Sequence, residues 1–316
     1  MPLSKMKPII WTIAIHILLM TSSTLAAEKL AVRFDLHTDH ISINIGEQAF
    51  ATYVFANDKI TRPFFAHVHA PNAVQVTRNH PPQPDDSQDH ATMHPGIWMA
   101  FGDISGHDFW RLKAPVVHHH FVVKPTTQPS GGTFTVENHY MATNSRQTVC
   151  VETCRYDILV RPTGYLLICS SKFTSNHDFY FGDQEEMGMA MRVATPLAVV
   201  NGGRILNSKA QRNGKEVWGK QADWADYSGT KEGTYVGMTL MADPNNFRHS
   251  WFHARDYGFI AANPFGVNAF TGGEKSKIHV KAGKSLRMRF GVFVHSNAKD
   301  KIDHAVNYRD FLDQLK

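Results

Sequence analysis

The sequence predicts an all-β protein, a large antiparallel β-sandwich that ends in a short helix. Three observations lead to this prediction. Apolar and polar residues alternate with a period of two in about a dozen segments, as expected of strands with one buried face. Turn residues recur every ten to fifteen positions or so, and helical segments do not separate the strands as they would in βαβ units.

The expected elements follow this alternation along the chain. Strands are predicted over residues 31–36, 41–45, 49–56, 116–123, 132–140, 149–161, 165–174, 189–200, 235–242, 257–262, 277–280 and 286–295. Residues 162–164 (Pro-Thr-Gly) form the turn between two of them. Only the end of the chain has a helical pattern, in which Asp300 is the expected cap and apolar residues recur at spacings near 3.6 from Ile302 to Leu315.

The first residues predict a signal peptide. Lys5 and Lys7 precede the apolar run 9–20, and small residues allow cleavage after Ala26. The run is shorter than the roughly 20 residues that a membrane span needs. We therefore expect a signal peptide over residues 1–26, a single β-sandwich domain over residues 27–316 without a membrane span, and a periplasmic or secreted bacterial protein.

Charge and cysteine content narrow the alternatives. The formal net charge is +5, and the basic residues are scattered, so we expect no nucleic-acid partner. Three cysteines, Cys150, Cys154 and Cys169, permit at most one intramolecular bridge. Cys169 could pair with either of the others across a hairpin, and three buried unpaired thiols are an equal alternative.

A segment broken by glycine and proline, residues 78–110, gathers histidine, aspartate and tryptophan. Packing does not require so many ionisable and aromatic groups in a loop, so such a loop usually carries function. Its candidate residues are Arg78, His94, Trp98 and Asp103. The alternative is a polar surface loop with two tryptophans in the core.

A second cluster pairs two carboxylates, Glu185 and Glu186, just before an expected strand that carries Arg192. Glycosyl transfer needs one carboxyl group as acid and a second as base or nucleophile, and sugar epimerisation needs a similar acid–base pair. Successive strand residues face opposite sides, so we expect at most one of the two to point into a site. The alternative is an acidic sheet edge that promotes solubility.

Two further segments, residues 220–229 and 245–266, mix aromatic with polar residues. Aromatic rings can stack on a pyranose while aspartate, asparagine and arginine bind its hydroxyls. Trp224, Asp226 and Arg255 are the candidates there. The same composition also fits an ordinary sandwich core with polar ends.

The chain has 19 histidines, and two groups of them invite a metal interpretation. His67 and His69, and His118 with His120 in the run 118–120, place imidazoles on one strand face. Neither an HExxH motif nor a CxxC pair accompanies them, so we expect no bound metal and no cofactor.

Several motifs resemble a known family. They are TRPFF at 61–65, VTRNHP at 76–81, HPGIWMAFGDISGHDFW at 94–110, DQEEMGMAMR at 183–192, WADYSG at 224–229 and RDYGFIAANPFG at 255–266. Together they resemble the PmoA-like family of secreted bacterial proteins of unknown function. The family commonly has a His-His pair before the Gly-Ile-Trp step. Here His94 matches the second histidine, and the first is displaced or lost.

The resemblance implies a sandwich of the galactose-mutarotase type, whose members bind or process sugars. It also brings the label of a methane oxygenase, which we reject because that enzyme's subunit is an integral membrane protein and this chain offers only one short apolar segment. Fold alone does not fix function.

The leading functional hypothesis is a carbohydrate-active enzyme, a hydrolase, lyase or epimerase that acts on a saccharide. Its expected catalytic residues are His94, Asp103, Glu185 and Glu186; its expected substrate-binding residues are Arg78, Trp98, Arg192, Trp224, Asp226 and Arg255. A non-catalytic carbohydrate-binding module is the first alternative, and a His-ligated metal-dependent enzyme is the second. The sugar, the bond and the oligomeric state are left open.

Overall fold

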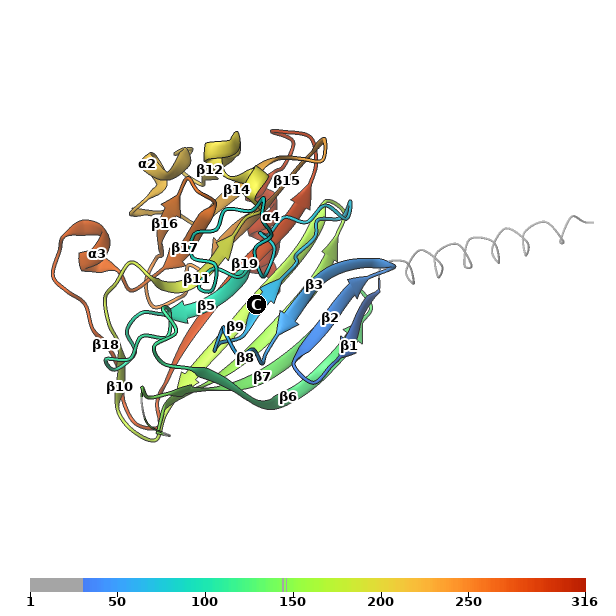
Figure 1. Cartoon of the computed structure of the whole chain (residues 1–316). Coiled ribbons are helices and arrows are strands. Elements are labelled where there is room, and N and C mark those ends of the chain that lie inside the picture. Colours follow the sequence, from blue (N-terminus) through green and yellow to red (C-terminus); the bar gives the residue numbers. More distant parts are fainter. Residues whose placement is uncertain (1–30, 144, 146) are drawn as a thin grey trace, which may run out of the picture.

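The computed structural model describes residues 31–143, 145 and 147–316 (Figure 1). The predicted signal peptide lies outside these residues. Within the described part, no helix combines the length and the apolar character that crossing a membrane requires.

Two large sheets form the body of the protein, and every strand pair in them is antiparallel. The first sheet has nine strands in the order β1-β2-β3-β4-β5-β11-β17-β16-β13. They are β1 (Val32–Leu36), β2 (His40–Ile45), β3 (Gln48–Val54), β4 (Phe64–Ala66), β5 (Ile97–Phe101), β11 (Met187–Arg192), β17 (Phe259–Asn263), β16 (Trp251–Arg255) and β13 (Lys220–Gln221).

The second sheet has eight strands in the order β12-β14-β15-β19-β9-β8-β7-β6. They are β12 (Arg204–Asn207), β14 (Trp224–Lys231), β15 (Thr234–Ala242), β19 (Ser285–Ser296), β9 (Gly164–Thr174), β8 (Thr148–Arg161), β7 (Gly131–Met141) and β6 (Val116–Gln128). A separate two-stranded sheet joins β10 (Phe179–Phe181) to β18 (Ile278–Val280).

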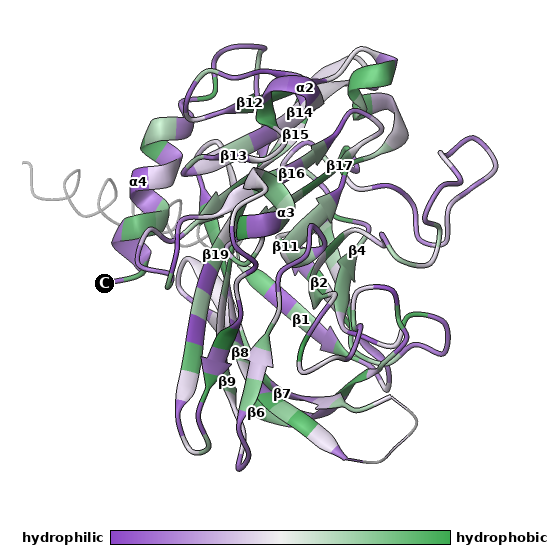
Figure 2. Ribbon diagram, turned by 90° about the vertical axis from the view of Figure 1, so that its left-hand side faces the viewer, coloured by the Kyte–Doolittle hydropathy of each residue, from purple (hydrophilic) through white to green (hydrophobic). Residues whose placement is uncertain are grey.

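The inner faces of the two large sheets pack against each other and form the main core. Strand β11 shows how the pleat sorts its residues. Met187, Met189 and Met191 enter the main core, whereas Ala190 packs in a second cluster on the opposite face of the sheet. Hydrophobic residues therefore concentrate in the strands, and the connecting loops are mainly hydrophilic (Figure 2).

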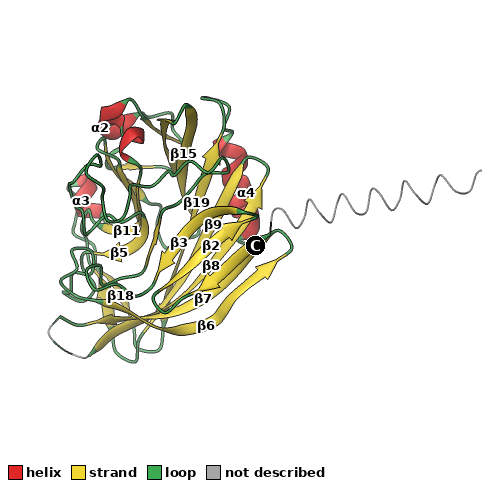
Figure 3. Ribbon diagram, turned by 45° about the vertical axis from the view of Figure 1, so that its right-hand side comes forward, coloured by secondary structure: helices red, strands yellow, loops and turns green. Residues whose placement is uncertain are grey.

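Three short helices complete the part of the chain that the structure describes: α2 (Asn213–Val217), α3 (Val267–Thr271) and α4 (His304–Gln314). The C-terminal helix α4 packs on the eight-stranded sheet, where Phe311 contacts a cluster that includes Leu166 and Phe293 (Figure 3). The predicted fold class, an all-β antiparallel sandwich with a short C-terminal helix, is confirmed.

Two predicted boundaries are wrong. The strand expected over residues 189–200 ends at Arg192, and 3₁₀ turns follow at Thr195–Leu197 and Val199–Asn201, because Pro196 cannot donate to a ladder. The helix is capped by Asp303, whose side chain accepts a hydrogen bond from the Val306 amide at 2.9 Å, and not by Asp300. Asp300 has φ +61°, outside the extended region that a cap residue adopts.

All three cysteines are free and buried. The Sγ atoms of Cys154 and Cys169 lie 3.4 Å apart on adjacent strands β8 and β9. Of the two alternatives that the sequence left open, the structure has the one with three unpaired thiols.

Candidate functional site

A group of polar and aromatic side chains lies on the face of the nine-stranded sheet that points away from the eight-stranded sheet. We call this the outer face. Four neighbouring strands build it, β5, β11, β17 and β16. Cross-strand pairing aligns their side chains, since Trp98 is opposite Ala190, and His253 is opposite Ala261. The outer face comprises Trp98, Ala100, Ala190, Arg192, His253, Arg255, Phe259 and Ala261.

The loop between β4 and β5 covers one end of this face, and Arg78 holds it in place. The Arg78 side chain is 1% exposed. It donates to four backbone carbonyl oxygens of the loop, those of Ser87 at 2.8 Å, Asp89 at 2.6 Å, His90 at 3.2 Å and His94 at 3.1 Å. Because these bonds engage both terminal nitrogens, Arg78 positions the loop and offers little to a ligand.

A second buried guanidinium, that of Arg192, ties the same loop to the sheet. It donates to the two carboxylate oxygens of Asp89 at 2.8 and 2.7 Å and lies 4.6 Å from the centre of the Tyr257 ring. Burial raises the pKa of Asp89, but the hydrogen bonds from Arg192, His90 and Ser87 outweigh it and hold that pKa well below its ordinary value. Asp89 is therefore ionised. Like Arg78, Arg192 positions the loop, and its guanidinium is engaged by Asp89 rather than offered to a ligand.

His94 lies inside an aromatic stack. Its ring centroid is 4.6 Å from those of His90 and Phe259 and 5.1 Å from that of Trp98. His94 is 4% exposed and Trp98 is 1% exposed. Burial, followed by the charge of His90 and then by those of nearby arginines, lowers the pKa of His94 to about 2. A neutral, enclosed imidazole cannot supply a proton at neutral pH, so the predicted role of His94 as an acid finds no support here.

This gives a direct prediction for His94. Its imidazole resonances are expected to keep constant chemical shifts between about pH 4 and pH 9, because the ring stays neutral far below the ordinary histidine pKa of about 6.5. A pH titration followed by NMR, with His94→Gln used for assignment, measures this. A shift change of the His94 signal centred near pH 6.5 would contradict the buried, neutral ring.

Among the residues at the outer face, Glu185 has the contacts best suited to acid–base chemistry. Its carboxylate is 34% exposed, accepts a hydrogen bond from Arg255 Nη2 at 3.0 Å and lies 3.3 Å from His253 Nε2. The other ring nitrogen, His253 Nδ1, is 3.3 Å from the Glu185 carbonyl oxygen. Burial and then the charge of Arg255 lower the pKa of His253 to about 3, so its ring is neutral.

The arrangement allows a protonated Glu185 carboxyl group to donate a hydrogen bond to His253. When Nδ1–H of His253 donates to the carbonyl oxygen, the lone pair of Nε2 faces the Glu185 carboxyl group. Nε2 is buried and has no hydrogen-bond partner among the described residues. A carboxyl group held in this way can exchange a proton with a bound hydroxyl.

Glu186 points to other partners. It pairs with Arg111, whose Nη1 donates to Asp108 at 3.2 Å. Adjacent glutamates thus separate, one toward Arg255 on β16 and the other toward the loop after β5. This separation agrees with the expectation that at most one of them serves a single site.

Trp218 is an aromatic residue of this region that the sequence did not single out. It is half-buried, its ring centroid lies 5.7 Å from the Arg255 guanidinium carbon, and it meets Phe270 edge-on. Its Nε1 has no hydrogen-bond partner among the described residues. It follows the short helix α2, and no local pattern in the sequence indicates its position beside Arg255.

The remaining predicted residues lie elsewhere. Asp103 accepts a hydrogen bond from the Gly106 amide at 2.8 Å and closes a turn. Trp224 stacks on His304 at 4.8 Å, and Asp226 is buried against His295, both on the eight-stranded sheet near α4. The structure therefore brings Arg78, His94, Trp98, Arg192, Glu185 and Arg255 to one face and leaves Asp103, Trp224 and Asp226 outside it.

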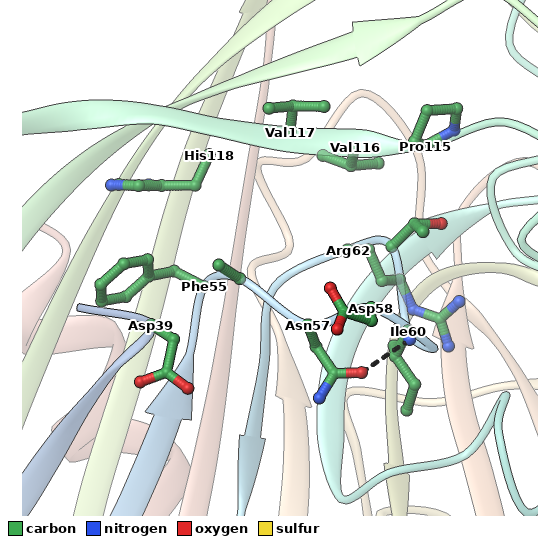
Figure 4. A pocket seen from close by; sticks show the side chains of 12 residues that line it. Asp39, Phe55, Asn57, Asp58, Ile60, Arg62, Pro115, Val116, Val117 and His118 are labelled. Carbon is green, nitrogen blue, oxygen red and sulfur yellow. Dashed lines mark hydrogen bonds between the residues drawn. The ribbon is translucent and has the colours of Figure 1, made fainter. Parts of the chain in front are cut away.

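A cavity of about 470 Å³ lies between residues 55–62 and 115–118 (Figure 4). It borders the outer face, because its lining residue Ile60 packs in the same cluster as Trp98, and Arg62 lies 5.5 Å from the centre of the Trp98 ring. Phe55 and His118 line one end of it, and Asn57 accepts a hydrogen bond from the Ile60 amide beside it. None of the ten predicted site residues lines this cavity. Its arginine, Arg62, donates to the carbonyl oxygens of Met93 and Trp110, so we favour the outer face as the site.

Comparison with known proteins gives a family and a set of distant folds. One family model, described as a family of unknown function, matches residues 40–307. None of the curated proteins matches this sequence.

Solved structures similar to the chain include sugar enzymes. The GH36 α-galactosidase AgaB from Geobacillus stearothermophilus is 11% identical with a TM-score of 0.45; the match covers 84% of this chain and 41% of that one. A galactose mutarotase related enzyme from Lactobacillus acidophilus is 12% identical with a TM-score of 0.36, over 86% and 99% of the two chains. A GalM/aldose epimerase homologue from C. elegans is 10% identical with a TM-score of 0.31, over 84% and 100%.

The chain thus spans about two fifths of the length of the α-galactosidase that it matches. The predicted galactose-mutarotase type of sandwich is represented among these structures. Similarity at this level carries no argument about activity.

Proposed function

The chain belongs to the family DUF6807, whose function is unknown, and we propose from the geometry of the outer face that it binds a saccharide there and performs acid–base chemistry on it. The observation that carries the proposal is the group formed by Glu185, His253 and Arg255. Its contacts of 3.0 and 3.3 Å place a cation, a carboxylate and a neutral imidazole together.

Each member has a role that its surroundings support. Glu185 is half-exposed and can accept a proton from a sugar hydroxyl or ring carbon. His253 is buried behind it, and its neutral ring can accept a hydrogen bond from the protonated carboxyl group and so hold that group in place. Arg255 neutralises the carboxylate while its guanidinium, 38% exposed, still reaches solvent and a ligand.

The surrounding side chains suit a polyol ligand. Trp218 lies beside Arg255 and is partly exposed, so its ring can contact a ligand there. Aromatic rings pack on the apolar faces of sugars, and cations and carboxylates bind their hydroxyls. The predicted platform Trp98 is buried, so Trp218 takes that place in the proposal.

Proton transfer, as in an epimerase or a lyase, fits this geometry better than hydrolysis. Glycoside hydrolysis uses two carboxyl groups that flank one bond. Here Glu186 is engaged by Arg111 and turns away from the partners of Glu185. The reaction proposed is therefore proton abstraction and return by Glu185, with His253 holding its carboxyl group in place.

The test uses Glu185→Gln, which keeps the size of the side chain and removes its charge. Against a panel of mono- and oligosaccharides, turnover is expected to fall by about a hundredfold or more, the range for loss of a general base. Saccharide binding, measured by calorimetry, is expected to change little. Glu186→Gln is the matched control and should keep most of the turnover. Unchanged turnover in Glu185→Gln would remove the proposed acid–base role, and binding without turnover by the unsubstituted chain would favour a non-catalytic carbohydrate-binding module.

We also propose that the chain is exported and that it is a member of the PmoA-like family. The signal peptide over residues 1–26 would bring the domain to the periplasm or the medium, where polysaccharides and their fragments occur. Residues 27–316 would then form the mature PmoA-like domain. The size of the secreted chain, measured by mass spectrometry, checks the cleavage position.

A further inference from the structure

The eight-stranded sheet carries a histidine cluster that the proposed function does not use. It lies at the sheet's edge, where β6 pairs with β7. Its members are His119 and His120 on β6 and Glu137 and His139 on β7. The outer face belongs to the other sheet, so this cluster and the Glu185 group are tested separately.

A β-bulge builds the cluster. The pairing register shifts between His118, which is opposite Asn138, and His120, which is opposite Glu137. In a regular strand, His118 and His120 would share a face, as the sequence led us to expect. The extra residue turns both His119 and His120 to the solvent side, where they are 57% and 51% exposed, beside Glu137. Bulges re-aim side chains in this way and are common next to functional sites.

The donor atoms converge. His139 Nε2 lies 2.8 Å from Glu137 Oε1, and His119 Nδ1 lies 3.3 Å from the same oxygen. The three ligand atoms of His119, Glu137 and His139 all lie within 4.8 Å of one another. Zinc bonds of about 2.0–2.1 Å in a tetrahedral site separate ligand atoms by roughly 3.3 Å, so small side-chain rotations would suffice.

His120 lies close enough to the other three residues to act as a further ligand. Its Nδ1 is 2.8 Å from His119 Nδ1 and 3.9 Å from Glu137 Oε1. Two imidazole nitrogens at 2.8 Å need a proton between them, or a cation that both can bind. Parallel stacking of the His119 and His139 rings, 4.4 Å apart at 8°, fixes their orientation.

We propose that His119, Glu137 and His139, with His120 beside them, bind one divalent transition-metal ion such as Zn²⁺. Imidazole nitrogen suits Zn²⁺, Cu²⁺ and Ni²⁺, whereas Mg²⁺ and Ca²⁺ prefer oxygen ligands. The ligands come from two strands joined by a hairpin, so the ion would fasten the edge strand β6 to β7. Bound metal would then stabilise the folded chain.

The experiment is calorimetric titration of ZnCl₂ into the chelator-treated full chain, expressed without a histidine tag. One equivalent of Zn²⁺ is expected to bind, and MgCl₂ at the same concentration should give no heat. His119→Ala, His139→Ala and Glu137→Gln are each expected to weaken binding by more than about tenfold, the smallest loss typical even of residues that only support a metal ligand.

His37→Ala is the matched control, since His37 and His40 form another stacked, surface-accessible pair, with centroids 4.3 Å apart. It should bind Zn²⁺ like the unsubstituted chain. Far-UV circular dichroism without metal identifies any variant that fails to fold, and the increase in melting temperature on adding Zn²⁺ should vanish in His139→Ala. Binding retained within twofold in both His119→Ala and His139→Ala would overturn the proposal. So would half an equivalent of Zn²⁺ per chain accompanied by dimerisation.

Discussion

Replacing Asp226 by alanine is expected to lower the free energy of unfolding by about 3–5 kcal/mol, the range seen when one partner of a buried ionic group is removed. Asp226 is fully buried, and its carboxylate accepts three hydrogen bonds. His295 Nε2 lies 2.7 Å from Oδ1, the Thr239 hydroxyl donates to Oδ1 at 2.9 Å, and the Ser228 hydroxyl donates to Oδ2 at 2.5 Å. Removing the carboxylate leaves the buried His295 without an acceptor and takes one partner from each of the two hydroxyl groups.

The pH dependence of this contribution follows from the direction of the pKa shift. Burial alone would raise the pKa of Asp226, but the charge and hydrogen bond of His295, with His304 and Ser228, lower it to about 2. The unfolded value is about 3.9. A carboxyl group with a lowered pKa in the folded state stabilises above the unfolded pKa, and that stabilisation is lost as the pH falls toward the folded pKa. We therefore expect the deficit of the alanine variant to shrink between about pH 5 and pH 2.

Urea unfolding at pH 7 and at several acidic values measures both effects. Asp178→Ala is a suitable control, because Asp178 is 54% exposed and its ion pair with Lys281 lies in solvent, where such pairs contribute little to stability. Asp226→Asn keeps the volume and two polar atoms, so it separates charge from packing. A deficit below about 1 kcal/mol in Asp226→Ala would show that the network does not stabilise the fold.

Sequence patterns predict those strands that have one solvent-exposed face and one buried face. In β2, intermediate and buried residues alternate strictly, and the sequence placed this strand within one residue of its actual start. Strands buried on both faces show no such alternation. All five residues of β5 are buried, because the main core covers one side of the strand and the loop held by Arg78 covers the other. This strand therefore went unrecognised inside a segment interpreted as a loop.

The residues of the candidate site also differ in whether the sequence could predict them. Glu185 and Arg255 could be named from residue chemistry, but their contact depends on the strand order β11-β17-β16, which no local pattern contains. His253 could have been found, since it stands two residues before Arg255 and so shares its strand face. From the sequence, Asp226 is as good a candidate site residue as Glu185, because its segment also mixes aromatic and polar residues. Only the structure shows that Asp226 lies on the other sheet.

Arg78 also illustrates why a residue type does not reveal its partners. The sequence predicted a ligand-binding guanidinium, whereas the structure uses it to hold the carbonyl groups of Ser87, Asp89, His90 and His94. Long-range chain folding decides whether an arginine fork meets a ligand or backbone oxygens. Arg78 therefore has a structural role: it holds the loop between β4 and β5 in place over the outer face.

Arg78→Ala is accordingly expected to destabilise the chain by about 3–5 kcal/mol, because it leaves one buried and three partly buried carbonyl oxygens without this donor and opens a cavity where the side chain is 1% exposed. Amide hydrogen exchange should accelerate most over residues 87–94. Lysine cannot reproduce the planar fork, so Arg78→Lys should recover only part of the loss. Arg155→Ala is the control, since Arg155 is 56% exposed in a surface pair with Asp157. Urea unfolding compares the variants, and equal stability of Arg78→Ala and Arg155→Ala would mean that the loop is held by its aromatic stack, centred on His94, rather than by the guanidinium.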